Sequence, residues 1–187
     1  MNISKNVFYV GVNDKQIDLF EGLYDVPNGM AYNSYVIMDD KIVVMDAVDE
    51  RFADEWLANV AKVLDGRTPD YLVVQHMEPD HSGSVMNFVN SYPSAKIVAS
   101  ARAFIMMKNF FGTDFADKRV QVKEGSELCL GEHTLTFVEA PMATKKMKDM
   151  LSNCKNLTYT NATVKILSAL SSESENQLAL LADELGQ

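Results

Sequence analysis

The chain has 187 residues, of which 17 are basic and 26 acidic, and its formal net charge is −9. Because 47% of the residues are hydrophobic and 23% charged, the composition is that of a globular protein, which excludes a disordered or fibrous chain. The acidic surplus disfavours nucleic acid as a partner, since phosphate binding requires a basic face. The apolar runs are too short to span a membrane, and no signal peptide is expected at Met1–Lys5. Two cysteines form no disulfide framework, which favours a reduced cytoplasmic setting.

The first part of the chain is predicted to form antiparallel strands. Two hairpins are expected, with the strand pairs Val7–Val12 with Gln16–Phe20 and Tyr32–Met38 with Lys41–Asp46. Asn13-Asp14 suits the first turn, because short polar residues tolerate turn geometry. Asp39-Asp40 is placed in the same way between the second pair of apolar, β-branched runs.

From residue 50 the hydrophobic period becomes that of helices alternating with buried strands. Apolar residues recur at helical spacing over Glu50–Leu64, and Gly66 just beyond them suits a C-cap. The continuous apolar run Asp70–Gln75 predicts a strand buried on both faces. Ser100 is expected to cap a helix that ends at Phe111, before Gly112. The other elements expected in this part are a helix, Val85–Asn90, and the strands Lys96–Ala99, Val120–Val122, Glu127–Leu130 and Thr134–Glu139. This mixture predicts the α/β class.

The composition shifts at about residue 142, after which Ser, Asn and Leu gather. Beyond this point we expect a helix over Thr144–Leu151, a strand over Thr163–Leu170 and a last helix over Glu175–Leu185. A capping box formed by Ser174 and Gln177 supports the last helix. The sequence therefore predicts two parts, residues 1–142 and residues 143–187.

One stretch concentrates residues that bind metals: His76-Met77-Glu78-Pro79-Asp80-His81, directly after the buried strand. The carboxyl end of a strand is where α/β sheets place their sites, and a polar loop is expected over residues 76–84. Alternate residues of an extended segment point the same way, so His76, Glu78 and Asp80 are expected to converge, with His81 turning in after them. Imidazole combined with carboxylate suits iron, manganese or zinc. The alternative is a solvated loop whose acids and histidines merely pair.

The pattern H-x-E-x-D-H after an apolar strand resembles the metal motif of the flavodiiron proteins, which join a metallo-β-lactamase-like domain to a flavodoxin-like domain. The resemblance extends to Tyr32–Ile37, Asp46, Tyr71–Val74 and Thr136–Met142. Hydrolases of this fold use H-x-H-x-D-H, so Glu78 favours a redox di-iron centre over a hydrolytic di-zinc centre. The resemblance implies that residues 1–142 form about half of a metallo-β-lactamase-like αβ/βα sandwich.

The same resemblance implies the metal ligands. His76 and Glu78 would bind one iron, and Asp80 and His81 the other. In the family, further histidine and aspartate ligands follow, but this chain has no histidine after His133. The bridging carboxylate has no counterpart, so at most one weakly held ion, zinc or iron, is expected. 

Two further residues have expected roles. Asp46 corresponds to a family position near the metal and is expected to orient a ligand. His133, in a predicted hairpin turn, is expected to be a surface residue.

Residues 143–187 resemble the last strand and helices of the family's flavodoxin-like domain. The phosphate loop that opens such a domain is absent from the sequence, so this chain lacks most of a site for FMN. The resemblance therefore describes a family member whose middle is missing, with a short flavodoxin-like strand and helix tail. A half-built sandwich leaves an unpaired apolar edge or face, so we expect a homo-oligomer or pairing with an intact family member.

By resemblance, the chain is a truncated oxidoreductase of flavodiiron type. The family reduces nitric oxide or dioxygen at a di-iron site with electrons from FMN, supplied by a donor such as rubredoxin or a flavoprotein reductase. Because the ligand set and the FMN site are incomplete, little or no turnover is expected from this chain alone. Two alternatives remain open. One is a non-catalytic metal-binding remnant or interaction module, and the other is a metallo-β-lactamase-superfamily hydrolase, which Glu78 disfavours.

Overall fold

A computed structural model describes residues 3–20, 22 and 24–138. The chain divides into two units, and all described residues belong to the first, Met1–Glu139. The elements expected at Thr144–Leu151, Thr163–Leu170 and Glu175–Leu185 lie outside the described residues. The division proposed at residue 142 stays a prediction.

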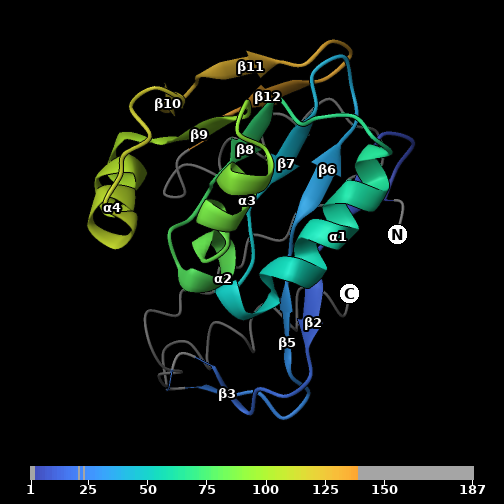
Figure 1. The fold of residues 1–187 in the computed structure, drawn as a ribbon, viewed down its shortest axis with the longest axis vertical. Helices are drawn as coiled ribbons and strands as arrows, with labels where there is room; N and C mark the ends of the chain where they lie inside the picture. The colour runs from blue at the N-terminus through green and yellow to red at the C-terminus, as the bar shows by residue number, and fades with distance from the viewer. Residues whose placement is uncertain (1–2, 21, 23, 139–187) are drawn as a thin grey trace, which may run out of the picture. The chain divides into compact units, whose positions relative to one another are not determined.

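A mixed sheet of six strands forms the centre of this unit, in the order β1-β6-β7-β8-β9-β10 (Figure 1). The strands are β1 Val7–Tyr9, β6 Tyr35–Ile37, β7 Val43–Met45, β8 Tyr71–Val73, β9 Lys96–Ser100 and β10 Arg119–Val122. Strands β1, β6 and β7 pair antiparallel, whereas β7 to β10 pair parallel. Parallel neighbours need crossover connections, which helices supply here, so the predicted α/β class is confirmed.

The helices of the crossovers pack on one face of the sheet (Figure 1). They are η1 Glu50–Phe52, α1 Ala53–Leu64, α2 Pro79–Ser82, α3 Val85–Ser91 and α4 Ala101–Phe111. Trp56 of α1 is fully buried, and its ring lies 5.9 Å from the ring of Phe88 in α3. Helix α4 begins and ends as predicted: the Oγ of Ser100 accepts the N–H of Ala103, and Gly112 has φ 75°. No helix among these is long and apolar enough to cross a membrane.

The other face of the sheet packs against a hairpin. Its strands, β11 Glu127–Cys129 and β12 Thr134–Thr136, pair antiparallel as predicted. Val43, Val73 and Val98 alternate onto this face and are fully buried, together with Leu130 of the hairpin turn. The sheet therefore has an apolar layer on both sides, which explains why β8 is a continuous apolar run.

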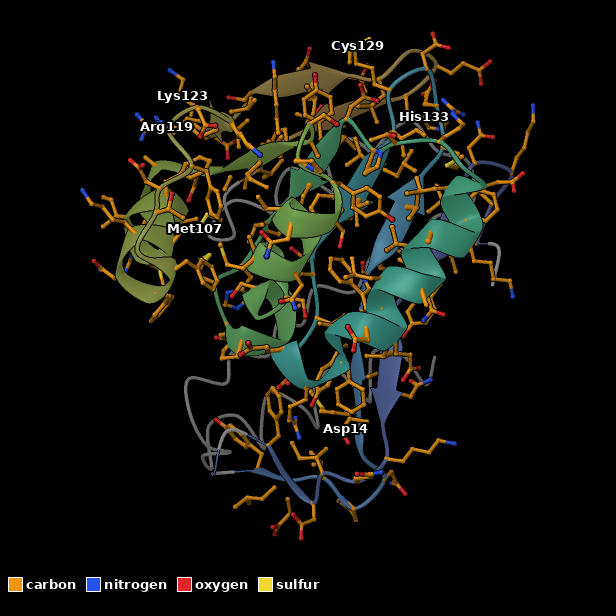
Figure 2. All side chains as sticks on the ribbon, viewed as in Figure 1. Asp14, Met107, Arg119, Lys123, Cys129 and His133 are labelled. Atoms are coloured by element: carbon orange, nitrogen blue, oxygen red, sulfur yellow. The ribbon has the colours of Figure 1, made fainter. Side chains whose placement is uncertain are left out.

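The first predicted hairpin is wrong. The strands that precede β6 pair as β1 with β6, β2 Val12–Asp14 with β5 Met30–Tyr32, and β3 Leu19–Phe20 with β4 Tyr24–Asp25. Asn13-Asp14 lies within β2 and makes no turn. Asp14, which is labelled in Figure 2, is 1% exposed. Its carboxylate accepts the phenol O–H of Tyr32 on the paired strand. Burial of this carboxylate against a partner 18 residues away outweighs the local turn preference.

The second hairpin and the first long helix are confirmed with shifted ends. β6 and β7 pair antiparallel on either side of Asp39-Asp40, whereas Tyr32, expected in the same strand, belongs to β5. The helix begins with a 3-10 turn before α1. It ends at Leu64 as predicted, and the two residues that follow, Asp65 with φ 47° and Gly66 with φ 83°, are both left-handed.

Candidate metal centre

The candidate ligands follow the carboxyl end of β8, as predicted, but they do not lie in one extended loop. Glu78 is extended, and α2 begins at Pro79, whose missing N–H is no loss at the first helical position. The Oγ of Ser82 donates to the carbonyl of Glu78 at 3.0 Å, which closes the turn. The predicted polar loop over residues 76–84 is therefore wrong for residues 79–82.

The segment after β7 holds α2 in place. The N–H of Ala47 donates to the carbonyl of His81 at 2.9 Å, and the N–H of Ser84 donates to the carbonyl of Val48 at the same distance. Gly83 lies between the two segments, and a Cβ added to it would lie 2.7 Å from backbone atoms. Only glycine permits this close approach, which positions the motif against the end of the sheet.

The four predicted ligands form two pairs. His76 Nε2 lies 3.2 Å from Glu78 Oε2, and both side chains are about half exposed. His81 Nε2 lies 3.5 Å from Asp80 Oδ2, and these side chains are mostly buried. The two imidazole rings stack with their centroids 5.3 Å apart, so the pairs are neighbours.

The side chains of His76, Glu78 and Asp80 do not converge on one point as expected. Within the described part of the chain, no group of three His, Cys, Asp or Glu side chains is placed to hold one metal ion. The predicted convergence of His76, Glu78 and Asp80 is therefore wrong. Its cause is α2, because helical backbone from Pro79 onwards ends the alternation of an extended segment.

Asp80 has an unusual environment. The residue is 8% exposed, and its Oδ1 atom is buried without a hydrogen-bond partner among the described residues. A buried polar group left unpaired costs about 1–3 kcal/mol, and more if it is charged. A cation bound at this carboxylate would remove that cost, so the orphan oxygen fits a metal ligand.

Asp46, at the end of β7, contacts the imidazole of His81, the partner of Asp80 in the more buried pair. Its Oδ2 lies 3.1 Å from Nδ1 of His81. An ionised carboxylate can only accept, so Nδ1 carries the proton and the neutral ring has its lone pair on Nε2, toward Asp80. The hydrogen bond to Asp46 raises the pKa of His81 and outweighs burial, which lowers it. This contact is the one expected if Asp46 orients a ligand, and that role stays a prediction.

Asp46 is itself fixed by several contacts. It is 4% exposed and has φ 57°, a left-handed conformation that Asp tolerates better than most residues. Its carboxylate accepts the backbone N–H of Gln75 at 2.7 Å and the side-chain N–H of Gln75 at 3.0 Å. Its carbonyl accepts the Oγ–H of Ser34 at 2.8 Å, and Ser34 Oγ accepts the indole N–H of Trp56 at 2.9 Å. Gln75 and Ser34 were not predicted as functional residues, because their only signal in the sequence is that Gln75 precedes His76 and that Ser34 lies within Tyr32–Ile37.

Comparisons with known proteins show which proteins this chain is similar to. Residues 30–156 match the family model described as "ODP family beta lactamase". A nitric oxide reductase from Moorella thermoacetica is 37% identical over 142 residues, which cover 75% of this chain and 35% of that protein. The rubredoxin oxygen:oxidoreductase structure from Desulfovibrio gigas has a TM-score of 0.71 at 32% identity, covering 76% of this chain and 35% of that one. The flavodiiron protein structure from Giardia intestinalis has a TM-score of 0.69 at 29% identity, with 75% and 34% covered. The chain thus spans about a third of the length of these relatives.

Proposed function

The chain belongs to the ODP family of beta-lactamase-like proteins, the metallo-β-lactamase-like part of flavodiiron proteins, and on that premise we propose that it binds a divalent metal ion at the two histidine and carboxylate pairs. Asp80 and His81 form the pair that binds first, and His76 and Glu78 form the outer pair. The observation that supports this most strongly is the buried, unpartnered Oδ1 of Asp80. The outer pair is half exposed, so water competes with the metal for both of its side chains.

The separation of the donor atoms supports the same proposal. Metal bonds to imidazole nitrogen and carboxylate oxygen are about 2.0–2.2 Å long, and two such bonds that meet near a right angle place their donors roughly 3 Å apart. The nitrogen and oxygen atoms lie 3.2 Å apart in the His76 and Glu78 pair and 3.5 Å apart in the His81 and Asp80 pair, where the oxygen is Oδ2 of the carboxylate whose Oδ1 is unpartnered. A pair of one nitrogen and one oxygen suits iron, manganese or zinc. Two protein donors leave most of the metal shell to water, so the ion is held weakly and only one is expected per chain.

The proposal extends to the reaction in which this metal site would take part. Two of the relatives named above are a nitric oxide reductase and a rubredoxin oxygen:oxidoreductase. The corresponding reaction reduces nitric oxide or dioxygen, with electrons from FMN and a donor such as rubredoxin or a flavoprotein reductase. Iron bound at the site would supply the one-electron chemistry. This chain's own residues bind and orient the ion, with Asp46 fixing the proton on His81 Nδ1.

We propose that this chain alone does not turn over nitric oxide or dioxygen. Each metal pair lacks further protein donors among the described residues, and the sequence has no phosphate cradle for FMN. The form of the function supported best is therefore a metal-binding part of a flavodiiron-type oxidoreductase. A hydrolytic function is disfavoured because Glu78 stands where hydrolases of this fold have histidine. A cytoplasmic setting and association with a second copy or an intact family member stay predictions.

The proposal is tested by metal titration of the full chain. Isothermal calorimetry with Zn²⁺, and with Fe²⁺ under anaerobic conditions, is expected to show one ion per chain that mild chelation removes. His81→Ala should abolish binding and His76→Ala should weaken it less, whereas His133→Ala, which changes the third histidine, should bind like the wild type. Absence of saturable binding would contradict the proposal, and two tightly held irons per chain would contradict its stoichiometry.

A further inference from the structure

An exposed glutamine, Gln75, covers the buried carboxylate of Asp46, which contacts His81 of the Asp80 and His81 pair. Gln75 is the residue between the end of β8 and His76, and its side chain is exposed, whereas Asp46 is 4% exposed. The backbone N–H of Gln75 donates to Asp46 Oδ1 at 2.7 Å, and its carboxamide N–H donates to Oδ2 at 3.0 Å. One residue therefore engages both oxygens of this carboxylate.

We infer that Gln75 is a positioning residue of the metal site, which acts through Asp46 on His81; the inference rests on the proposed function. Oδ2 of Asp46 accepts both the carboxamide N–H of Gln75 and Nδ1–H of His81. With three donors on two oxygens, the plane of the carboxylate is fixed. The ring of His81 follows that plane, so Nε2 is directed to the side where Asp80 Oδ2 lies 3.5 Å away.

Loss of the carboxamide would relax this arrangement. Asp46 Oδ2 would keep only His81, and the carboxylate would be free to rotate about the remaining backbone N–H on Oδ1. The imidazole would then sample other orientations and its other neutral tautomer. Because metal bonds to imidazole are directional, groups that hold a ligating histidine through its second nitrogen affect affinity strongly.

The exposure of Gln75 separates this role from a structural one. Its side chain buries little area, and ordering a glutamine side chain costs conformational entropy, so the hydrogen bond adds little to folding stability. Ser34 and Trp56, in contrast, support Asp46 from within the core. A change at Gln75 is therefore expected to alter the site without altering the fold.

The test replaces the carboxamide without changing its length. Gln75→Met in the full chain is expected to bind Zn²⁺ about 10- to 100-fold more weakly than the wild type. The unfolding midpoint of the metal-free variant should stay within roughly 2 °C of the wild type, because the backbone N–H of Gln75 and the ring of His81 still pair both oxygens of Asp46. Gln121→Met, on the exposed side of β10, is the matched control and should leave both quantities unchanged.

A second measurement needs no metal. Nitrogen-15 chemical shifts of the His81 ring, recorded with the ring neutral, should report the Nδ1–H tautomer in the wild type and a mixture of tautomers in Gln75→Met. If the wild type binds no Zn²⁺, the proposed function fails, while the tautomer comparison still tests the role of Gln75. Equal affinity and equal ring shifts in the two proteins would overturn the inference. So would a large fall in the unfolding midpoint, which would make Gln75 a structural residue.

Discussion

Oδ2 of Asp39 lies 2.7 Å from Nδ1 of His133, although 94 residues separate the two in the chain. Asp39 is in the turn between β6 and β7. His133, labelled in Figure 2, is in the turn of the β11–β12 hairpin. The same carboxylate accepts the backbone N–H groups of Glu132 and His133. The N–H of Lys41 donates to the carbonyl of Leu130 beside it. These bonds join the hairpin to the central sheet, whereas the sequence alone predicts only a surface residue at His133.

This junction predicts a dependence of stability on acidic pH. Burial raises the pKa of Asp39, but the imidazole of His133 and the backbone N–H groups of both turns hold it well below its ordinary value. Such a carboxylate stabilises the fold above its unfolded pKa of about 3.9 and loses this effect as pH falls through the folded pKa. The advantage of the wild type over Asp39→Asn in free energy of unfolding should therefore shrink from pH 4 to pH 2. Urea unfolding at each pH measures this difference, with exposed Asp40→Asn as control, and an advantage as large at pH 2 as at pH 4 would contradict the prediction.

Gly131 tests the same junction by steric means. It has φ 133°, and a Cβ added to it would lie 2.5 Å from Asp39 Oδ1. Gly131→Ala is expected to lower the free energy of unfolding by more than Gly125→Ala, which has a positive φ of 75° but open space around its Cβ. The control alone should cost about 1 kcal/mol, because an alanine is strained in this region. Equal losses of unfolding free energy in chemical denaturation would show that the contacts between the two turns do not contribute to stability.

Ser34 predicts a large effect from the loss of one hydroxyl. The residue is fully buried, and its Oγ accepts from Trp56 Nε1 and donates to the carbonyl of Asp46. Ser34→Ala leaves both groups buried without this partner, which should cost about 2 kcal/mol or more. Ser91→Ala, an exposed serine at the end of α3, should change stability by less than about 0.5 kcal/mol. Thermal unfolding of both variants measures these effects, and equal unfolding midpoints for Ser34→Ala and Ser91→Ala would refute the prediction.

Elements with strong local signals were predictable from the sequence. Ser100 and Gly112 mark both ends of α4, and the apolar run of β8 indicates burial on both faces before any partner is known. The pairing of the first strands was not predictable, because short strands of similar composition do not specify their partners. Asp14 favours a turn locally, yet its carboxylate is paired with Tyr32 and Arg51, 18 and 37 residues away. Such contacts exist only once the chain is folded.

The candidate site was also only partly predictable from the sequence. The type of ligand at residues 76, 78, 80 and 81 follows from the sequence, but their arrangement in pairs follows from the helical turn at Pro79. Pro79 was a sequence signal for this turn, because proline is common at the first position of a helix, but the prediction of an extended segment did not use it. The hydrogen bonds from Gln75 and Ser34 to Asp46 depend on how β7, β8 and the preceding strand meet, so no local pattern indicates them.

The unpaired oxygen of Asp80 predicts opposite effects of one substitution on metal-free stability and on metal binding. Asp80→Asn replaces a buried, partly unsatisfied carboxylate by a neutral amide, so the metal-free variant should be as stable as the wild type or about 1 kcal/mol more stable. Zn²⁺ should stabilise the wild type, because an ion that binds only the folded state adds about 2.7 kcal/mol at 100 times its Kd. The variant should lose most of this response.

Urea unfolding with EDTA and with excess Zn²⁺ measures both effects in one series. Asp117→Asn is the matched control, because it makes the same change of charge at an exposed residue and should keep the full response to Zn²⁺. If Asp80→Asn responds to Zn²⁺ like the wild type, Asp80 is not a ligand. A loss of more than about 2 kcal/mol in the metal-free variant would instead mean that its carboxylate already has a strong partner, because only a broken buried interaction costs that much.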